Sequence, residues 1–217
     1  MGLLAEKDRE YLKNEFQALG RPVKLVVFTQ ERECQYCRET RELSEELAEL
    51  SAQIAVDVVT FDPDGDAARQ YNIDKIPAIA LIADGPEPVD YGIRFYGIPS
   101  GYEFSTLIEG IMMVAAGDSG LPAELKKQVA AIDKPVHMQV FITPTCPYCP
   151  QAVHLAHQLA MENPNVKADM VEAIEFPHLS NKYNVMGVPR TVINETYHLE
   201  GAAPGAMVLD KIAEALA

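Results

Sequence analysis

The chain contains four cysteines, and every one of them belongs to a C-x-x-C pair. The stretch ERECQYCRE (31–39) holds Cys34 and Cys37, and TPTCPYCPQ (143–151) holds Cys146 and Cys149. Cysteines at this spacing can bind a metal ion, form a permanent bridge, or cycle between dithiol and disulfide. The secondary structure around each pair indicates which of these three chemistries applies.

A redox dithiol is favoured where the pair lies at the start of a helix. The first helical turn presents unpaired backbone N–H groups and the positive end of the helix dipole, and both stabilise a thiolate. In such settings the pKa of the first cysteine falls from ~8.5 to roughly 3.5–7.5. Spacing i, i+3 places the second sulfur one turn away on the same face. We therefore expect Cys34 and Cys146 to be nucleophiles, and Cys37 and Cys149 to be resolving thiols.

Residues inside the pairs have smaller expected roles. Pro147 is predicted at the first helical position, where proline is well tolerated. Tyr36 and Tyr148 flank the sulfurs, and we expect their rings to cover the disulfide edge rather than to act as acids or bases.

The residues before the pairs predict unequal nucleophiles. Glu33 precedes Cys34, whereas Thr145 precedes Cys146. A negative charge beside a cysteine disfavours its thiolate. Cys146 is therefore predicted to be the more acidic of the two.

The elements that must position the pairs occur twice in the chain. KLVVFTQERECQYCRET (24–40) and HMQVFITPTCPYCPQA (137–152) share an apolar β-branched run, a polar loop, C-x-x-C and a helical pattern. YNIDKIPAIALI (71–82) matches YNVMGVPRTVIN (183–194) in the same way. Cys34, Tyr71 and Pro77 each recur 112 positions later. This constant spacing indicates a tandem duplication.

Hydrophobic periodicity predicts one order of elements in both copies. In the first copy it gives helices 3–19, 34–51, 64–71 and 106–117, and strands 23–29, 54–62, 77–83 and 89–96. In the second it gives helices 122–132, 147–161, 176–183 and 205–216, and strands 136–142, 166–172, 189–194 and 196–200. The fold class is therefore α/β, with a mixed sheet flanked by helices in each copy. The short boundary GDSGLP (117–122) predicts that the copies pack together.

These motifs resemble a known family. C-P-Y-C with GVPRTVI downstream looks like the thioredoxin/glutaredoxin superfamily, and two such units resemble the protein disulfide oxidoreductases (glutaredoxin-like proteins) of thermophilic archaea and bacteria. The resemblance implies two tandem thioredoxin-like domains, 1–118 and 119–217. It also implies cis prolines at Pro77 and Pro189, after Ile76 and Val188, that bind substrate and bar metal opposite the cysteines.

The resemblance further implies the reaction and the partners. The substrates would be protein dithiols and disulfides, and the redox-active disulfides would need no cofactor. A flavoprotein of the thioredoxin-reductase type would supply electrons. An alternative is a redox carrier that passes electrons from such a flavoprotein to a peroxiredoxin, although one repeat of that kind of segment has lost its C-x-x-C.

Two other chemistries remain open to the cysteines. Four cysteines suit zinc or an iron–sulfur cluster, but common zinc ribbons separate their pairs by ~15–20 residues, whereas Cys37 and Cys146 lie much further apart. A permanent i, i+3 bridge would close so small a loop that it stabilises little.

The overall composition excludes some classes of partner. The chain has 217 residues, of which 48% are hydrophobic, and a formal net charge of −14. Such an acidic protein repels nucleic-acid phosphates and anionic membranes. Charged residues begin at Glu6, and no apolar run reaches the ~18 residues of a membrane helix, so we expect a cytoplasmic protein.

A few other polar residues are given structural roles. His154 and His157 are expected on the surface or half-buried rather than on a metal, and Asp57 and Asp169 are expected to point outward from matching strand positions. Arg190, where the first copy has Ala78, is expected to be a solvated strand end rather than a substrate contact.

Overall fold

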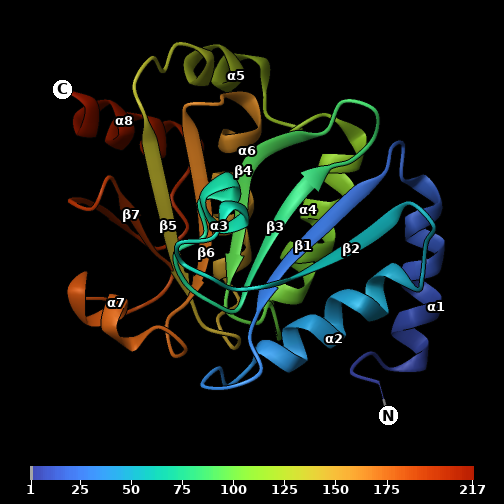
Figure 1. The fold of residues 1–217 in the computed structure, drawn as a ribbon. Coiled ribbons are helices and arrows are strands. Elements are labelled where there is room, and N and C mark those ends of the chain that lie inside the picture. The colour runs from blue at the N-terminus through green and yellow to red at the C-terminus, as the bar shows by residue number, and fades with distance from the viewer. Residues whose placement is uncertain (1) are drawn as a thin grey trace.

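A computed structural model describes residues 2–217 and has helices packed on both faces of one sheet (Figure 1). In this described part the sheet has eight strands in the order β2-β1-β3-β4-β6-β5-β7-β8. The first copy contributes β1 (Val23–Thr29), β2 (Ile54–Thr60), β3 (Ala78–Ala83) and β4 (Val89–Tyr96). The second contributes β5 (Val136–Ile142), β6 (Val166–Glu172), β7 (Arg190–Ile193) and β8 (Tyr197–Glu200).

The helices follow the predicted order with small shifts at their ends. The first copy has α1 (Glu6–Glu15), followed by the short 3-10 turn η1 (Phe16–Ala18), and then α2 (Cys37–Ala48), α3 (Asp66–Tyr71) and α4 (Glu103–Ala116). The second has α5 (Ala123–Ala130), α6 (Cys149–Glu162), α7 (Pro177–Lys182) and α8 (Gly205–Leu216). Within residues 2–217, none of these helices is long and apolar enough to cross a membrane.

The sheets of the two copies are continuous. β4 pairs in parallel with β6, from Ile93 opposite Ala168 to Tyr96 opposite Val171. The prediction of a mixed sheet flanked by helices is confirmed. The two copies contact each other through the backbone pairing of β4 with β6. β6 consequently lies inside the sheet, whereas β2, its counterpart, lies at the edge.

The two faces of the sheet carry different layers of helices. One face bears the larger core, which includes residues of α2, α4, α6 and α8, such as Leu47, Ile111, Val153 and Ile212. The other face bears a smaller core around Phe28, Tyr96 and Phe141, and the helices of residues 2–217 that pack there are the short α3 and α7. Figure 1 shows α3 in front of the strands and α7 at the lower left, below β7.

The strand directions bring both C-x-x-C pairs to one edge. β1, β4, β5 and β6 all run parallel to one another, so the loops after β1 and β5 leave at the same edge. Three strands, β3, β4 and β6, separate β1 from β5. At 4.7–4.9 Å between neighbouring strands, the two loops start ~19 Å apart. The two dithiols therefore face the same side without touching.

Candidate functional site

The pair in the second copy forms a disulfide at the start of α6. Cys146 and Cys149 are bonded, with their Cα atoms 5.5 Å apart. Cys146 lies in the turn after β5, where its backbone N–H donates to the Thr143 carbonyl over 3.1 Å. Cys146 is 7% exposed and Cys149 is fully buried. The first sulfur can thus be approached from solvent only by a group that docks closely, and the second cannot be approached at all.

The pair in the first copy has the same form in a more open setting. Cys34 and Cys37 are also bonded, again with Cα atoms 5.5 Å apart. Cys37 is buried, whereas Cys34 is half-buried. Glu33, just before Cys34, adopts a left-handed backbone with φ of 56°, and its side chain is exposed.

Both helices begin at the second cysteine, which corrects one prediction. Tyr36 and Tyr148 are the N-cap residues, and Cys37 and Cys149 are the first helical residues. Pro147 therefore lies in the turn before α6, and Pro150 occupies the first helical turn instead. The proline does not set this start, because α2 begins at the equivalent residue with Gln35 in its place.

The two tyrosines differ in exposure. Tyr148 is 69% exposed, so most of its ring faces solvent. Tyr36 is half-buried, and the Gln35 side-chain amide donates to its hydroxyl over 3.1 Å.

The proline loops occupy equivalent places beside the two pairs. The Ile76–Pro77 and Val188–Pro189 bonds are both cis, as the family resemblance implies. Pro77 accepts a hydrogen bond at its carbonyl from the Gly97 N–H (2.9 Å), and Pro189 accepts one from the Gly201 N–H (2.8 Å). The strand pairing with β1 and β5 begins only at Ala78 and Arg190, so Ile76 and Val188 lie beyond the last paired residue.

Arg190 differs from the prediction of a solvated strand end. Its side chain is 14% exposed and forms an ion pair with Glu200, the residue opposite it on β8. The charge is thus directed to the neighbouring strand, because β8 supplies a carboxylate at that register.

The four cysteines do not converge on a metal site. The two pairs lie on loops after β1 and β5, which three other strands separate. Among residues 2–217, no group of three or more His, Cys, Asp or Glu side chains is arranged to hold a metal ion.

A buried acid from the first copy lies at the start of the second copy's helix. Helices α4 and α6 run side by side in the same direction: the Tyr102 N–H donates to the Pro144 carbonyl over 3.0 Å, and Glu109 approaches His154 at 3.4 Å. Glu103, next to Tyr102, therefore lies level with the first turn of α6, where Cys149 is buried.

The Glu103 carboxyl is buried on α4 near the Thr106 hydroxyl, which partly offsets the effect of burial on its pKa. It is fully buried, and neither of its oxygens has a hydrogen-bond partner within the described residues. Burial raises the pKa of Glu103 to about 7, and the nearby Glu109 carboxylate adds to the shift. Sequence reasoning missed this residue, because Glu103 has no counterpart in the repeat and nothing in the sequence shows that the two helices meet.

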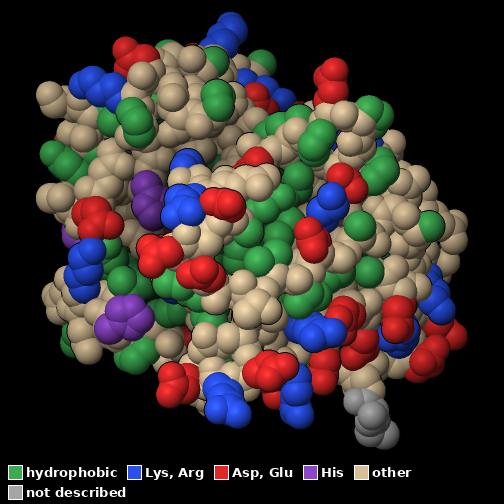
Figure 2. Space-filling view, viewed as in Figure 1, with side chains coloured by type: hydrophobic (Ala, Val, Ile, Leu, Met, Phe, Trp, Pro, Cys, Tyr) green, Lys and Arg blue, Asp and Glu red, His purple; other side chains and the backbone are tan. Residues whose placement is uncertain are grey.

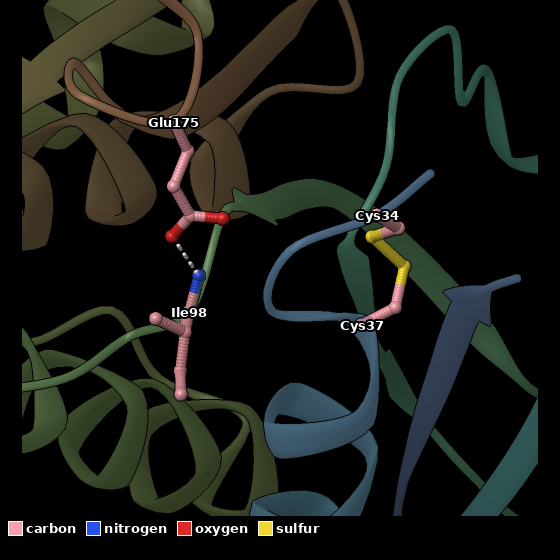
Figure 3. The surroundings of a disulfide bond; sticks show 4 residues. All are labelled: Cys34, Cys37, Ile98 and Glu175. Atoms are coloured by element: carbon pink, nitrogen blue, oxygen red, sulfur yellow. Dashed lines mark hydrogen bonds between the residues drawn. A yellow bond between two sulfur atoms is a disulfide. The ribbon is translucent and has the colours of Figure 1, made fainter. Parts of the chain in front are cut away.

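A pair of neighbouring carboxyls, Glu172 and Glu175, lies where the two copies join. The Glu175 carboxylate accepts a hydrogen bond from the Ile98 N–H over 2.8 Å, and the Glu175 N–H donates to Glu172 over 2.6 Å. Figure 3 shows Glu175 and Ile98 in the surroundings of the Cys34–Cys37 disulfide. Burial raises the pKa of Glu175 to about 7, with a further contribution from Glu172.

Replacing Glu175 by Gln is expected to stabilise the protein at about pH 8 and to change little at about pH 5. The folded-state pKa of Glu175 lies above its usual 4.5, so the folded protein binds the extra proton between these values and loses stability as the pH rises. The loss is at most about 1.4 kcal/mol per pKa unit. Gln keeps the oxygen that accepts from Ile98 and carries no charge.

Urea denaturation of the wild type and of Glu175→Gln at both pH values measures this difference. Glu10→Gln, which removes an exposed carboxyl of α1, is the matched control and should show no such dependence. A Gln variant that is less stable than the wild type at the higher pH would contradict the assignment of Glu175 as a destabilising buried acid.

The two matching aspartates have opposite environments. Asp57 is exposed on the edge strand β2, as predicted. The prediction is wrong for Asp169, which is 4% exposed and lies 2.6 Å from the His137 ring nitrogen. Because β6 is internal, Asp169 faces a cavity of about 460 Å³ together with His137 and Arg94. This cavity opens on the face of α3 and α7, away from the helices that carry the cysteines.

The two histidines of α6 lie in different environments. His154 is half-buried, as predicted, and faces Glu109. His157 is 1% exposed, which corrects the surface prediction, and it packs edge-on against Phe95 with ring centroids 4.9 Å apart. Burial lowers the pKa of His157 to about 3, so it stays neutral.

Comparison with known proteins gives relatives for the whole chain. A family model described as a thioredoxin domain matches residues 136–214. A protein disulfide oxidoreductase from Aeropyrum pernix superposes with a TM-score of 0.89 at 31% identity, covering 97% of this chain and 93% of that one. A structure of the alkylhydroperoxide reductase component AhpF from Enterococcus faecalis superposes with a TM-score of 0.86 at 30% identity, covering 99% of each chain.

The curated relatives are longer proteins. The corresponding AhpF component of alkyl hydroperoxide reductase from Pseudomonas putida is 26% identical over 204 residues, which are 94% of this chain and 36% of the relative. The chain thus spans about a third of that relative's length.

Proposed function

Because the chain belongs to the tandem thioredoxin-fold protein disulfide oxidoreductases, we propose that it forms, reduces or isomerises protein disulfides at two sites, through mixed-disulfide intermediates. The observation that carries the proposal is the placement of both C-x-x-C disulfides at helix starts on one sheet edge, each beside a cis-proline loop. The sequence divides at 118/119 into the two units that hold these sites.

Each cysteine has one role in the exchange. In the reducing direction, the Cys146 thiolate attacks a substrate disulfide and expels one substrate sulfur, which takes up a proton. Cys149 then loses its proton and attacks the Cys146 sulfur, which releases the second substrate thiol. The substrate gains two electrons and the chain becomes the disulfide. Cys34 and Cys37 perform the same steps at the first site, and the oxidising direction reverses them.

Glu103 accepts the proton from Cys149. A fully buried thiol has no water to take its proton, and a carboxyl with a pKa of about 7 exchanges protons readily near neutral pH. The burial of Glu103 at the level of the first turn of α6 supports this role. The acid that serves the second dithiol is therefore supplied by the first copy.

The proline loops bind the substrate. Ile76 and Val188 lie beyond the last paired residues of β3 and β7, so their backbone groups can pair with an extended substrate segment in the manner of an added strand. Tyr36, Pro147 and Tyr148 flank this approach. The nucleophiles are unequal, with Cys146 the more acidic of the two.

The partners follow from the same chemistry. The substrates are protein dithiols and disulfides, the redox-active disulfides are the redox groups of the chain, and a flavoprotein of the thioredoxin-reductase type returns electrons to them. We place the reaction in the cytoplasm, since every cysteine belongs to an exchange pair and none is used as a structural bridge.

A redox carrier is the second candidate function. It is favoured by the similarity to the AhpF component of alkyl hydroperoxide reductase across 94% of this chain. In this function the chain would pass electrons from the flavoprotein to a peroxiredoxin. The presence of both C-x-x-C pairs favours the two-site oxidoreductase.

Removal of one pair at a time tests the proposed function. The Cys34→Ser/Cys37→Ser and Cys146→Ser/Cys149→Ser variants are each expected to retain part of the reduction of insulin and the refolding of a scrambled disulfide protein, and the variant without any of the four cysteines should have none. Full activity in the cysteine-free variant would refute the proposal. If the protein reduces a peroxiredoxin but neither insulin nor a scrambled protein, it is a redox carrier instead.

A further inference from the structure

The rims of the two dithiols differ in chemistry at corresponding positions. Three positions around the second pair are prolines where the first pair has polar or charged residues: Pro144, Pro147 and Pro150 replace Arg32, Gln35 and Arg38. Two further positions are apolar in the second copy and acidic in the first. Ile174 corresponds to Asp62, and Met186 corresponds to Asp74.

The fold gathers the apolar residues of the second copy at one edge. Ala173 donates to the Ile142 carbonyl over 2.9 Å where β5 ends, so Ile174 follows directly at that edge. Met186 lies three residues before Pro189, and Tyr148 lies two residues after Cys146. All three side chains are open to solvent: Met186 is 86% exposed, Ile174 71% and Tyr148 69%. Exposed apolar groups gathered around a site mark a surface that a partner covers.

The first copy has a charged surface at the same place. Phe61 donates to the Thr29 carbonyl over 2.8 Å where β1 ends, so Asp62 takes the position of Ile174. An open groove of about 840 Å³ beside Cys34 is lined by Arg32, Glu33, Arg38 and Arg41. Figure 2 shows acidic and basic side chains mixed along the lower edge of the molecule, where the loop after β1 lies in Figure 1.

We propose that the two dithiols select different substrates, and that the Cys146 site takes extended protein segments whose cysteine is flanked by large apolar side chains, as exposed by unfolded chains. This inference rests on the proposed thiol–disulfide exchange and names the substrate class of one site. Cys146 is 7% exposed, so a substrate sulfur reaches it only when the flanking residues lie against the rim. At the first site the same flanking residues would cover the Asp62 carboxylate and the ion pair of Asp74 with Lys75, and burying charged groups opposes binding.

Two synthetic peptides distinguish the sites. Each carries one cysteine as a mixed disulfide with thionitrobenzoate, and the flanking residues are Leu and Phe in one peptide and Asp and Lys in the other. Attack by the reduced chain releases thionitrobenzoate, whose absorbance reports the rate, and the resolving cysteine then frees the peptide thiol. The protein gives up two electrons and ends as its disulfide, so one equivalent of each thiol is formed.

The readout is the ratio of the second-order rate constant for the apolar peptide to that for the charged peptide, both measured in a single turnover of the reduced protein. In a protein that retains only the Cys146 site, the ratio is expected to be about 10 or more, since covering even part of two large apolar side chains is sufficient for a tenfold gain. In a protein that retains only the Cys34 site, it is expected to be about 1 or less. A ratio cancels differences in the intrinsic reactivity of the two nucleophiles.

Exchange of rim residues between the copies completes the test. Ile174→Asp with Met186→Asp gives the second site the residues of the first, and the ratio should fall to about 2 or less. Asp62→Ile with Asp74→Met should raise the ratio of the first site. The matched control is Tyr11→Asp, which alters an exposed apolar residue of α1 and should leave the ratio of the second site at its original value.

The possible results separate this inference from the proposed function. If both single-site proteins reduce hydroxyethyl disulfide but show equal peptide ratios, or if Tyr11→Asp lowers the ratio as much as the rim exchange, the substrate assignment is overturned and the exchange activity stands. If neither single-site protein reduces hydroxyethyl disulfide, the proposed function fails and the substrate assignment fails with it.

Discussion

Glu103→Gln is expected to slow disulfide exchange at the Cys146 site by about 100-fold, because general acid–base catalysis by a positioned side chain contributes roughly 10²–10⁴-fold. Cys149 is fully buried and must lose a proton before it can attack the mixed disulfide. Gln has nearly the same shape as Glu but cannot accept that proton. The first step, attack by Cys146, does not need Glu103, so mixed disulfides should accumulate in the variant and be trapped by acid quenching.

The pH dependence of the exchange rate tests whether Glu103 is the proton acceptor. In a protein with only the Cys146 site, the rate should rise with pH through about 7, as Glu103 ionises and becomes able to accept the proton. In Glu103→Gln this rise should be absent. The Cys34 site, which Glu103 does not approach, should keep its rate in both proteins.

The stability of Glu103→Gln gives a second readout, because the substitution should raise stability at high pH while it lowers activity. The folded-state pKa of Glu103 is raised above 4.5, so the wild type loses stability as the pH rises from about 4.5 to 7. Glu103→Gln should therefore be more stable than the wild type at about pH 8 although it is less active. Glu10→Gln, which removes an exposed carboxyl of α1, is the matched control for both measurements. A Gln variant with wild-type rates across the pH range would exclude Glu103 as the proton acceptor.

The sequence predicts the elements well because the apolar pattern decides them locally. β5, β6 and α8 have the predicted bounds, since alternating or helical apolar positions mark them without reference to the rest of the chain. The C-x-x-C pairs and the proline loops were also found from the sequence, because the 112-residue repeat presents each motif twice.

What the sequence does not predict depends on how the copies meet. The repeat describes each copy alone, and nothing in it specifies that β4 pairs with β6. That pairing makes β6 an internal strand, which buries Asp169 while Asp57 stays exposed, and it sets α4 beside α6, which buries Glu103 near the second dithiol. Asp169, which was misplaced, and Glu103, which was missed, thus lie at the junction, where two similar patterns are given different neighbours.

Gly101→Ala is expected to disable the Cys146 site and to destabilise the protein by about 2–5 kcal/mol, the sum of a left-handed backbone and a backbone clash. Gly101 has φ of +60°, and a Cβ atom there would lie 2.2 Å from the Pro144 carbonyl oxygen. Pro144 lies two residues before Cys146 on the same loop. The clash can be relieved only by moving that loop or the start of α4, and a displacement of about 1 Å at a reacting atom can reduce the rate by about 100-fold.

A matched glycine separates the two contributions. Gly120 has φ of +71°, but a Cβ atom there would meet nothing closer than the Gln158 side-chain nitrogen at 3.8 Å. Gly120→Ala should therefore lose only the ~1–2 kcal/mol of the left-handed backbone and keep full exchange at both sites. Thermal unfolding and the rates of single-site proteins measure both effects.

For Gly101→Ala, which of the two sites loses exchange activity is more informative than how much activity is lost. Gly101 belongs to the first copy, yet its replacement should reduce exchange at Cys146 and spare Cys34, because the atom it would strike belongs to the loop of the second dithiol. Equal loss at both sites would mean that the variant acts through general unfolding, and loss at Cys34 alone would contradict the contact. Selective loss at Cys146, together with the effect of Glu103→Gln, would establish that the first copy builds part of the second copy's active site.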